Sequence, residues 1–170
     1  MSRHWFHGYL YEYYSKNKMV ALDVGCGTRP YHNDYRCNYI GLDLPSRTYE
    51  KIYPDIFAEA STLPFRDKTF DFVVSSGVLP YIKDVDMTIS EMHRILKSDG
   101  LALIIIMNLN GLALHPNDHF WNRWNSRKLK QKLKEHKFKS VLKMNLKALL
   151  WATYFDITSV YSYAVVTPIK

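Results

Sequence analysis

A short apolar run that ends in two glycines constrains this chain more than any other feature of its sequence. Residues 19–24 read MVALDV and predict a buried strand, apolar throughout except for Asp23. Gly25 and Gly27 follow at once, separated only by Cys26. Glycine adopts backbone conformations that are closed to residues with a side chain, and it lets a ligand approach the backbone closely. A strand that breaks into such a turn predicts a nucleotide-binding site at its end.

Further strands and helices alternate along the chain. Residues 39–44, 70–76 and 100–107 are rich in β-branched or aromatic side chains and predict three more strands. Residues 85–97 carry apolar side chains at helical spacing and predict a helix between the last two. Strands that alternate with helices in this way predict a parallel, doubly wound sheet.

The two ends of the chain complete the expected fold. Residues 4–18 predict an aromatic-rich helix or an irregular lead-in. Ser126 can cap a helix that runs to about His136 and buries Leu129 and Leu133. The segments 139–146 and 159–169 predict two closing strands, with an apolar helical segment at 147–155 between them. We therefore expect residues 1–170 to form a single α/β domain. It would be a Rossmann-like, doubly wound and mostly parallel sheet of six or seven strands with helices on both faces, with 1–18 as a short N-terminal cap and 108–126 as a substrate-side loop.

The composition of the chain indicates in which cellular compartment the protein is expected. A hydrophobic fraction of 47% over 170 residues predicts one folded globular domain. No apolar run reaches membrane-spanning length, and the N-terminus lacks the aliphatic core of a signal peptide, so we expect a cytoplasmic protein without stable membrane insertion. Cys26 and Cys37 suit a reducing compartment. A metal site that includes His32 is an alternative, but the spacing matches no zinc pattern, and small buried thiols are the favoured interpretation.

The net charge of +7 is concentrated in one stretch. Residues 123–147 hold ten lysines or arginines and a single acid, Glu135. Such a stretch binds polyanions or forms a solvated helix face. The lysines at 128, 130, 132 and 134 are spaced by two, which spreads them around a helix and favours the solvated face. We expect weak polyanion binding at 123–147, and the apolar segment beside it could dock on lipid or on a second subunit in a homodimer.

The turn also indicates which nucleotide it holds. A dinucleotide site would have a glycine at the position of Pro30 and would offer a free amide there to pyrophosphate. Asp23 would repel pyrophosphate, whereas it can hold an ammonium group; stabilisation of the loop is its alternative role. Asp43 ends the next strand, where a carboxylate can accept both hydroxyls of a ribose. These features favour S-adenosylmethionine over NAD.

Four segments in this order and spacing resemble the class I S-adenosylmethionine-dependent methyltransferases, most closely the type 11 methyltransferase domain. They are LDVGCGT, YIGLDL, LPFRDKTFDFVVSSGVLPYI and EMHRILKSDGLALIII, spanning about residues 19 to 107. The resemblance implies cofactor-binding roles for the loop, for the ribose and adenine contacts, and for the strand that floors the methyl-donor site. The implied loop residues are Asp23, Gly25, Cys26, Gly27 and Thr28. The implied ribose and adenine contacts are Asp43, Leu44, Glu59 and Ala60. Ser75 and Ser76 end the strand beneath the methyl-donor site.

The chain departs from the family pattern at several positions. Arg29 replaces the third loop glycine, and Glu59 replaces the usual aspartate opposite the adenine amino group. Residues 97–100 read KSDG where relatives have a Lys-Pro-Gly-Gly turn. Tyr81 stands where many relatives have histidine, which weakens the case for a histidine base.

The resemblance implies methyl transfer to an O, N or C acceptor. The sulfonium is already activated, so the enzyme mainly aligns the reactants, and no catalytic triad is expected. Tyr81, His115 and His119 are the candidate bases. Asp118 and Arg123 either bind a polar acceptor or pair with each other. The Asn/Asp-Pro-Pro-aromatic motif of amino-methylating enzymes is absent after strand 70–76.

Three functions therefore remain open. A small-molecule methyl acceptor is favoured. A macromolecular acceptor, whether tRNA, protein or lipid, is the alternative that would use the basic stretch 123–147. A non-catalytic, cofactor-binding partner subunit is the third.

Overall fold

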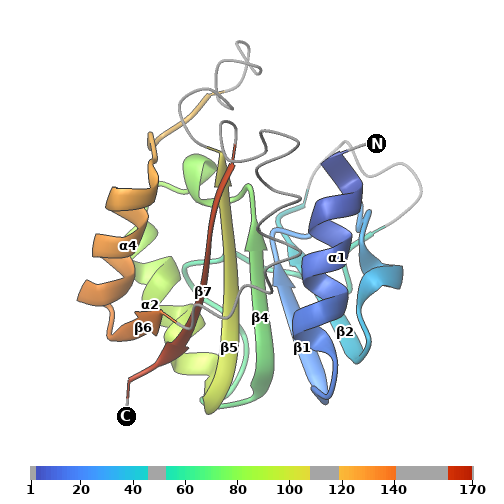
Figure 1. Ribbon diagram of the computed structural model, residues 1–170. Coiled ribbons are helices and arrows are strands. Elements are labelled where there is room, and N and C mark those ends of the chain that lie inside the picture. Colours follow the sequence, from blue (N-terminus) through green and yellow to red (C-terminus); the bar gives the residue numbers. More distant parts are fainter. Residues whose placement is uncertain (1–2, 46–52, 108–118, 141–160, 170) are drawn as a thin grey trace.

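The computed structural model describes residues 3–45, 53–107, 119–140 and 161–169 of the chain (Figure 1). Within these ranges seven strands form one sheet in the order β3-β2-β1-β4-β5-β7-β6, which confirms the expected α/β fold. The strands are β1 (Val20–Val24), β2 (Asn38–Asp43), β3 (Ile56–Phe57), β4 (Phe70–Ser76), β5 (Leu96–Met107), β6 (Phe138–Ser140) and β7 (Tyr161–Pro168).

The pairing of the strands fixes where a ligand can bind. β1 to β5 pair in parallel, whereas β7 runs antiparallel to both β5 and β6. The chain proceeds from β1 to β2 and β3 on one side, and then crosses back to place β4 on the other side of β1. In open α/β sheets, ligands bind outside the carboxyl ends of the strands at such a reversal. Val24, which ends β1, and Ser76, which ends β4, lie at this edge.

Within the described residues, helices α1, α2 and α4 cover the two faces of the sheet (Figure 1). Helix α1 (Arg3–Ser15) packs on one face, with Tyr11 against Phe72 and Val74 of β4 in one apolar cluster. Helices α2 (Val85–Ile95) and α4 (Ser126–Glu135) pack on the other face. Successive strand residues face opposite sides, so the continuous apolar run in β4 serves both cores. Among the described helices, none is long and apolar enough to cross a membrane.

The structure corrects several sequence-based boundaries. The cap of α4 is Asn125, whose Oδ1 accepts from the amide of Lys128 at 2.8 Å, and Ser126 is the first helical residue. Asn and Ser are equally good caps, so their order alone could not decide between them. Leu129 and Leu133 are buried as expected. The segment 147–155 and most of the strand expected at 139–146 lie outside the described residues.

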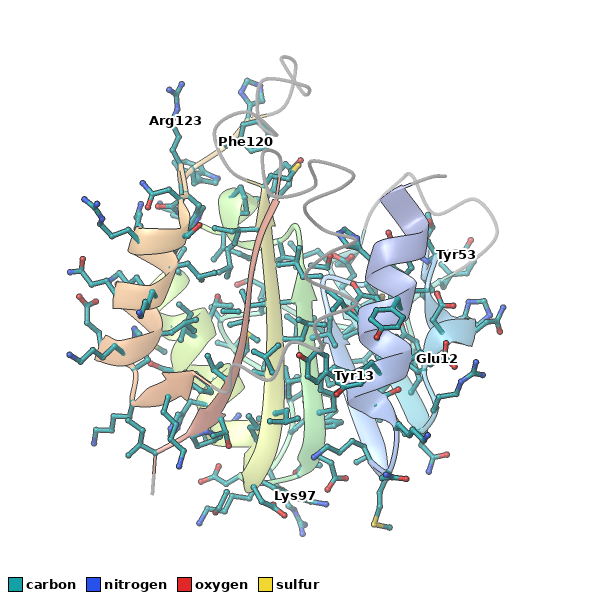
Figure 2. All side chains as sticks on the ribbon, in the orientation of Figure 1. Glu12, Tyr13, Tyr53, Lys97, Phe120 and Arg123 are labelled. Carbon is teal, nitrogen blue, oxygen red and sulfur yellow. The ribbon has the colours of Figure 1, made fainter. Side chains whose placement is uncertain are left out.

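Strand β5 begins earlier than predicted. It starts at Leu96, and its register with β4 shifts between Phe70 and Phe72, where β5 has extra residues. Residues 97–100 therefore form an irregular part of the strand rather than a separate turn. Lys97 anchors it through a 2.9 Å ion pair with Asp71, at the opposite end of the sheet from Phe120 and Arg123 (Figure 2).

The loop before β4 is held by one guanidinium group. Arg94 of α2 donates to the carbonyl of Phe65 at 2.7 Å and to that of Leu63 at 3.1 Å. It also pairs with Glu91 at 2.7 Å and with Asp67 at 2.8 Å. The fork of five donors in arginine matches this set of acceptors. The loop is thereby fixed on α2, and the end of that loop leads into β4.

Candidate functional site

Backbone hydrogen bonds fix the conformation of the glycine turn after β1. The amides of Gly25 and Cys26 both donate to the carbonyl of Leu42, at 2.8 and 3.1 Å. Gly25 has φ +77°, and a Cβ on it would lie 2.2 Å from Cγ2 of Val78. Gly27 has φ +55° with nothing within 4 Å of the position of a Cβ. Gly25 is therefore required by both conformation and space, and Gly27 by conformation alone.

Asp43 closes the turn from the end of β2. Its Oδ2 accepts from the amide of Gly27 at 2.7 Å, and its Oδ1 accepts from the amide of Leu44 at 2.7 Å. The carboxylate is only half-buried. Because each carboxylate oxygen has more than one lone pair, Asp43 can hold the loop and still accept hydrogen bonds from a ligand.

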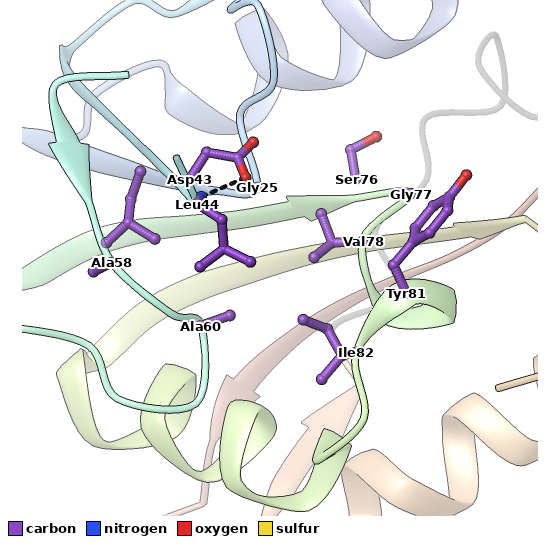
Figure 3. Close-up of a pocket in the computed structure, with 11 residues that line it drawn as sticks. Gly25, Asp43, Leu44, Ala58, Ala60, Ser76, Gly77, Val78, Tyr81 and Ile82 are labelled. Carbon is purple, nitrogen blue, oxygen red and sulfur yellow. Dashed lines mark hydrogen bonds between the residues drawn. The ribbon is translucent and has the colours of Figure 1, made fainter. Parts of the chain in front are cut away.

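A cavity of about 280 Å³ lies against this turn (Figure 3). Its volume is close to the lower end of the roughly 300–1,000 Å³ range of small-ligand sites. Most of its wall is apolar, and polar groups come from Asp43, Ser76 and Tyr81. In Figure 3, Asp43 and Leu44 lie toward one end and Tyr81 toward the other. The apolar walls and the carboxylate suit a flat, uncharged ring joined to a sugar.

Six of the predicted site residues line the cavity. They are Gly25, Asp43, Leu44, Ala60, Ser76 and Tyr81. The lining also includes five residues that were not predicted from the sequence, namely Leu42, Ala58, Gly77, Val78 and Ile82. Gly77, Val78 and Ile82 lie just after β4. The rule that ligands bind at the carboxyl ends of strands could therefore have predicted their place in the cavity wall.

The other predicted cofactor residues do not line the cavity. Cys26 is buried, and its burial raises the pKa of the thiol to about 12. Gly27 and Thr28 lie on the turn. Ser75 is fully buried one residue before the cavity wall, and Glu59 is exposed and accepts from Ser61 at 3.4 Å.

The structure does not bring all of the candidate bases and acceptor-side residues together at the cavity. The ring of Tyr81 lies 5.0 Å from that of Phe120, which with Arg123 stands beyond the carboxyl ends of the strands (Figure 2). His119 is exposed and does not line the cavity. His115 and Asp118 lie outside the described residues.

Arg29 occupies the place of the third loop glycine in a glycine-like conformation. Its φ is +55°, which costs energy for a residue with a side chain. The side chain offsets this cost, since its guanidinium lies 4.9 Å from the centroid of the Tyr39 ring and pairs with Asp55 at 2.8 Å. No α-helix follows the turn before β2. The short turn η1 (His32–Asp34) stands there instead, and a dinucleotide site needs a helix N-terminus for pyrophosphate.

Comparison with known proteins agrees with this geometry. Residues 22–104 match the family model described as a methyltransferase domain. The chain belongs to this methyltransferase family. The matched segment runs from β1 to β5, so it includes the glycine turn, Asp43 and the described lining of the cavity. S-adenosylmethionine is the cofactor of the family.

Three proteins that are similar to this chain in sequence have different names. The uncharacterized protein MJ0638 of Methanocaldococcus jannaschii is 30% identical over 107 residues, which cover 61% of this chain and 47% of that protein. The mitochondrial arginine-hydroxylase NDUFAF5 of Mus musculus is 31% identical over 48% of this chain and 27% of its own length. The 2-phytyl-1,4-naphtoquinone methyltransferase of Nostoc punctiforme is 31% identical over 51% of this chain and 39% of its own length. The chain thus spans less than half the length of these relatives.

Solved structures share the fold. The PH0226 protein of Pyrococcus horikoshii superposes with a TM-score of 0.74 at 20% sequence identity. The match covers 98% of this chain and 90% of that one. This likeness extends beyond the family match at both ends of the chain.

Proposed function

We propose that this protein transfers a methyl group from S-adenosylmethionine to an O, N or C acceptor on a small molecule. One observation carries the proposal, which is the cavity at the reversal between β1 and β4. Gly25 and Asp43 border it on one side, and Ser76 and Tyr81 on the other. The adenosine would lie against Leu44 and Ala60, with its ribose hydroxyls on Asp43.

Methyl transfer requires mainly that the reactants are aligned. Transfer from a sulfonium is an in-line displacement, and positioning of the reactants supplies roughly 7–11 kcal/mol. Tyr81 stands at the end of the cavity away from Ala58, where an acceptor could approach the methyl group (Figure 3). We propose that its hydroxyl orients the acceptor. His119, which does not line the cavity, and His115 stay candidate bases.

A macromolecular acceptor is the second candidate. Trp121 is 66% exposed, and the ammonium of Lys83 lies 5.6 Å from the centroid of its ring. The amide of Trp121 donates to the carbonyl of Pro80 at 2.9 Å, which fixes it beside the turn η2 (Leu79–Tyr81). An exposed aromatic ring with a cation near the cavity could stack on a base of RNA. A cofactor-binding subunit without activity is the remaining alternative.

Calorimetry with three ligands tests the proposal. S-adenosylmethionine and S-adenosylhomocysteine should bind, whereas NAD should not, because no helix N-terminus faces the turn. A screen of small acceptors and of tRNA would follow, with transfer of a labelled methyl group as the readout. Preference for NAD would contradict the proposal. Binding without transfer to any acceptor would favour the partner-subunit alternative.

A further inference from the structure

A second cavity, of about 590 Å³, lies beside the one at the glycine turn. Tyr81 and Ile82 line the first cavity, and Lys83, the next residue along the chain, lines the second. The side-chain amide of Asn122, which also lines the second cavity, donates to the carbonyl of Ile82 at 2.7 Å. A molecule that meets the methyl group near Tyr81 can therefore reach the second cavity.

Three lysines line this second cavity, one just before α2 and two on α4. They are Lys83, Lys128 and Lys132. Lys132 is balanced locally, because its ammonium group lies 2.7 Å from Oδ1 of Asp86, which also lines the cavity. Among the described residues, no carboxylate forms an ion pair with Lys83 or with Lys128. Two ammonium groups are thus available to a ligand.

Aromatic rings hold these two ammonium groups in place. The Nζ of Lys83 lies 5.6 Å from the centroid of the Trp121 ring. The Nζ of Lys128 lies 4.8 Å from the centroid of the Trp124 ring and donates to the carbonyl of Arg123 at 3.2 Å. A ring attracts a cation through its quadrupole, and an ammonium group has three donors, so each lysine keeps donors for a ligand.

Two helices begin at the same cavity. Val85 is the first residue of α2, Lys128 lies in the first turn of α4, and both residues line the cavity. Asp84, the other carboxylate in the lining, caps α2 by accepting from the amide of Met87 at 3.0 Å. The N-terminus of a helix carries a partial positive charge and attracts anions. The helix termini and the two lysines together favour a negatively charged ligand.

One buried donor in the lining also lacks an acceptor. Trp124 is 1% exposed, and its indole Nε1 has no hydrogen-bond partner in the part of the chain that the structure describes. Buried N–H groups in native proteins are almost always paired. An oxygen atom of a ligand in the cavity that Trp124 lines would satisfy this donor.

We propose that the second cavity binds a phosphate group of the methyl acceptor. The inference rests on the proposed function and names the class of acceptor, which is a phosphorylated molecule whose methylated atom lies near Tyr81. Lysine binds phosphate as a point charge. A phosphate monoester carries a charge of about −2 near pH 7 and has three acceptor oxygens. It therefore gains more than a carboxylate from two separate ammonium groups and a nearby indole N–H.

A titration with inorganic phosphate tests the proposal. The protein is held with saturating S-adenosylhomocysteine, and sodium chloride keeps the ionic strength constant. Nuclear magnetic resonance follows the indole N–H signal of Trp124, which reports on this cavity alone. We expect saturable binding that shifts this signal, and no such shift when chloride replaces phosphate.

Single lysine variants locate the site. Lys83→Ala and Lys128→Ala should each weaken phosphate about five- to tenfold, whereas Lys83→Arg should keep most of the affinity because it keeps the charge. Lys130→Ala is the matched control, since Lys130 is an exposed lysine of α4 that does not line the cavity. The affinity for S-adenosylhomocysteine should stay unchanged in all four variants, because none of these lysines lines the first cavity.

Two further ligands identify the source of the phosphate. Phenyl phosphate represents a small phosphorylated acceptor, and an unstructured RNA oligomer represents a macromolecular one. Binding of phenyl phosphate that is weakened in Lys83→Ala and unchanged in Lys130→Ala supports the site with a small acceptor. The same pattern for the RNA oligomer alone supports the site with a phosphodiester backbone as its ligand.

Three results would overturn the proposal. They are the absence of saturable phosphate binding, an affinity that neither Lys83→Ala nor Lys128→Ala changes, and an equal loss in Lys130→Ala, which would indicate diffuse attraction to the basic surface. Binding of S-adenosylhomocysteine in the same samples would leave the proposed function standing. Failure of S-adenosylhomocysteine to bind would contradict the proposed function itself and the inference with it.

Discussion

At the scale of single residues, Asp43 holds the glycine turn, and we propose that it also binds the cofactor. Asp43→Ala should weaken S-adenosylmethionine by about 1.5–3 kcal/mol, the range for hydrogen bonds to a charged group. The melting temperature should also fall, because the amides of Gly27 and Leu44 lose their acceptor. Calorimetry and thermal unfolding measure the two effects, with exposed Asp99→Ala as the control. Unchanged cofactor affinity would show that the cavity has been wrongly assigned.

Tyr81 lines the cavity, and we propose that it faces the reacting end of the site rather than the nucleoside. Tyr81→Phe should lower kcat about tenfold or more and leave the cofactor affinity nearly unchanged, because only acceptor alignment is lost. Steady-state kinetics with an active acceptor and calorimetry on the same variant provide the test. Equal losses in both would mark Tyr81 as a cofactor or packing residue.

The raised pKa of Asp23 also predicts how stability depends on pH. Burial raises the pKa of Asp23 to about 7 in the folded protein, whereas the carboxyl group in the unfolded chain has its ordinary pKa of about 3.8. The contribution of this group is therefore fully present below about pH 4 and is lost as the pH rises toward 7. The loss is of the order of 4 kcal/mol. Urea unfolding of the empty protein should show this decline, and Asp23→Asn should flatten it. A decline of equal size in the variant would assign the effect to other groups.

At the scale of elements, the contact between α2 and the loop before β4 depends on Arg94. Arg94→Ala leaves the carbonyl of Phe65 without this donor, and the carbonyl of Leu63 and the carboxylate of Glu91 keep only their backbone amide donors. The free energy of unfolding should fall by about 2–3 kcal/mol. Arg94→Lys should recover little of it, because one ammonium cannot replace the fork of donors. Exposed Lys130→Ala is the control, and a loss equal to that control would show that the network contributes nothing.

At the scale of the whole molecule, charge is concentrated on α4. Lys132 is paired with Asp86 at 2.7 Å and with Glu135 at 3.3 Å, so only part of the basic stretch is available to a partner. Exposed Arg127, Lys130 and Lys134 remain on α4. We expect weak binding to polyanions, without sequence preference, that is lost as salt rises. Fluorescence anisotropy with unrelated RNA and DNA oligomers over a salt series measures it. Tight RNA binding that survives high salt would instead favour a tRNA acceptor.

The sequence alone determined the order of the main elements and the edge of the sheet that binds a ligand. Strand β4 is a short run of β-branched and aromatic residues and helix α2 has apolar residues at helical spacing, and their place in the chain implies the reversal beside β1. Asp43 and the glycines were predictable because a turn and a strand end impose local conformations that few residue types satisfy.

Only the tertiary structure decided the rest. Val78 and Ile82 enter the cavity wall because strands distant in sequence bring η2 against the glycine turn, and no local pattern encodes that contact. Strand β3, two residues long, is too short to produce a period. The environment of Asp23 depends on Tyr11 of α1 and on Tyr35 and Tyr39 at the entry to β2, and the pKa of a carboxyl group follows from its solvation rather than from its neighbours in sequence. Local conformation can be predicted from sequence, whereas burial results from the whole fold.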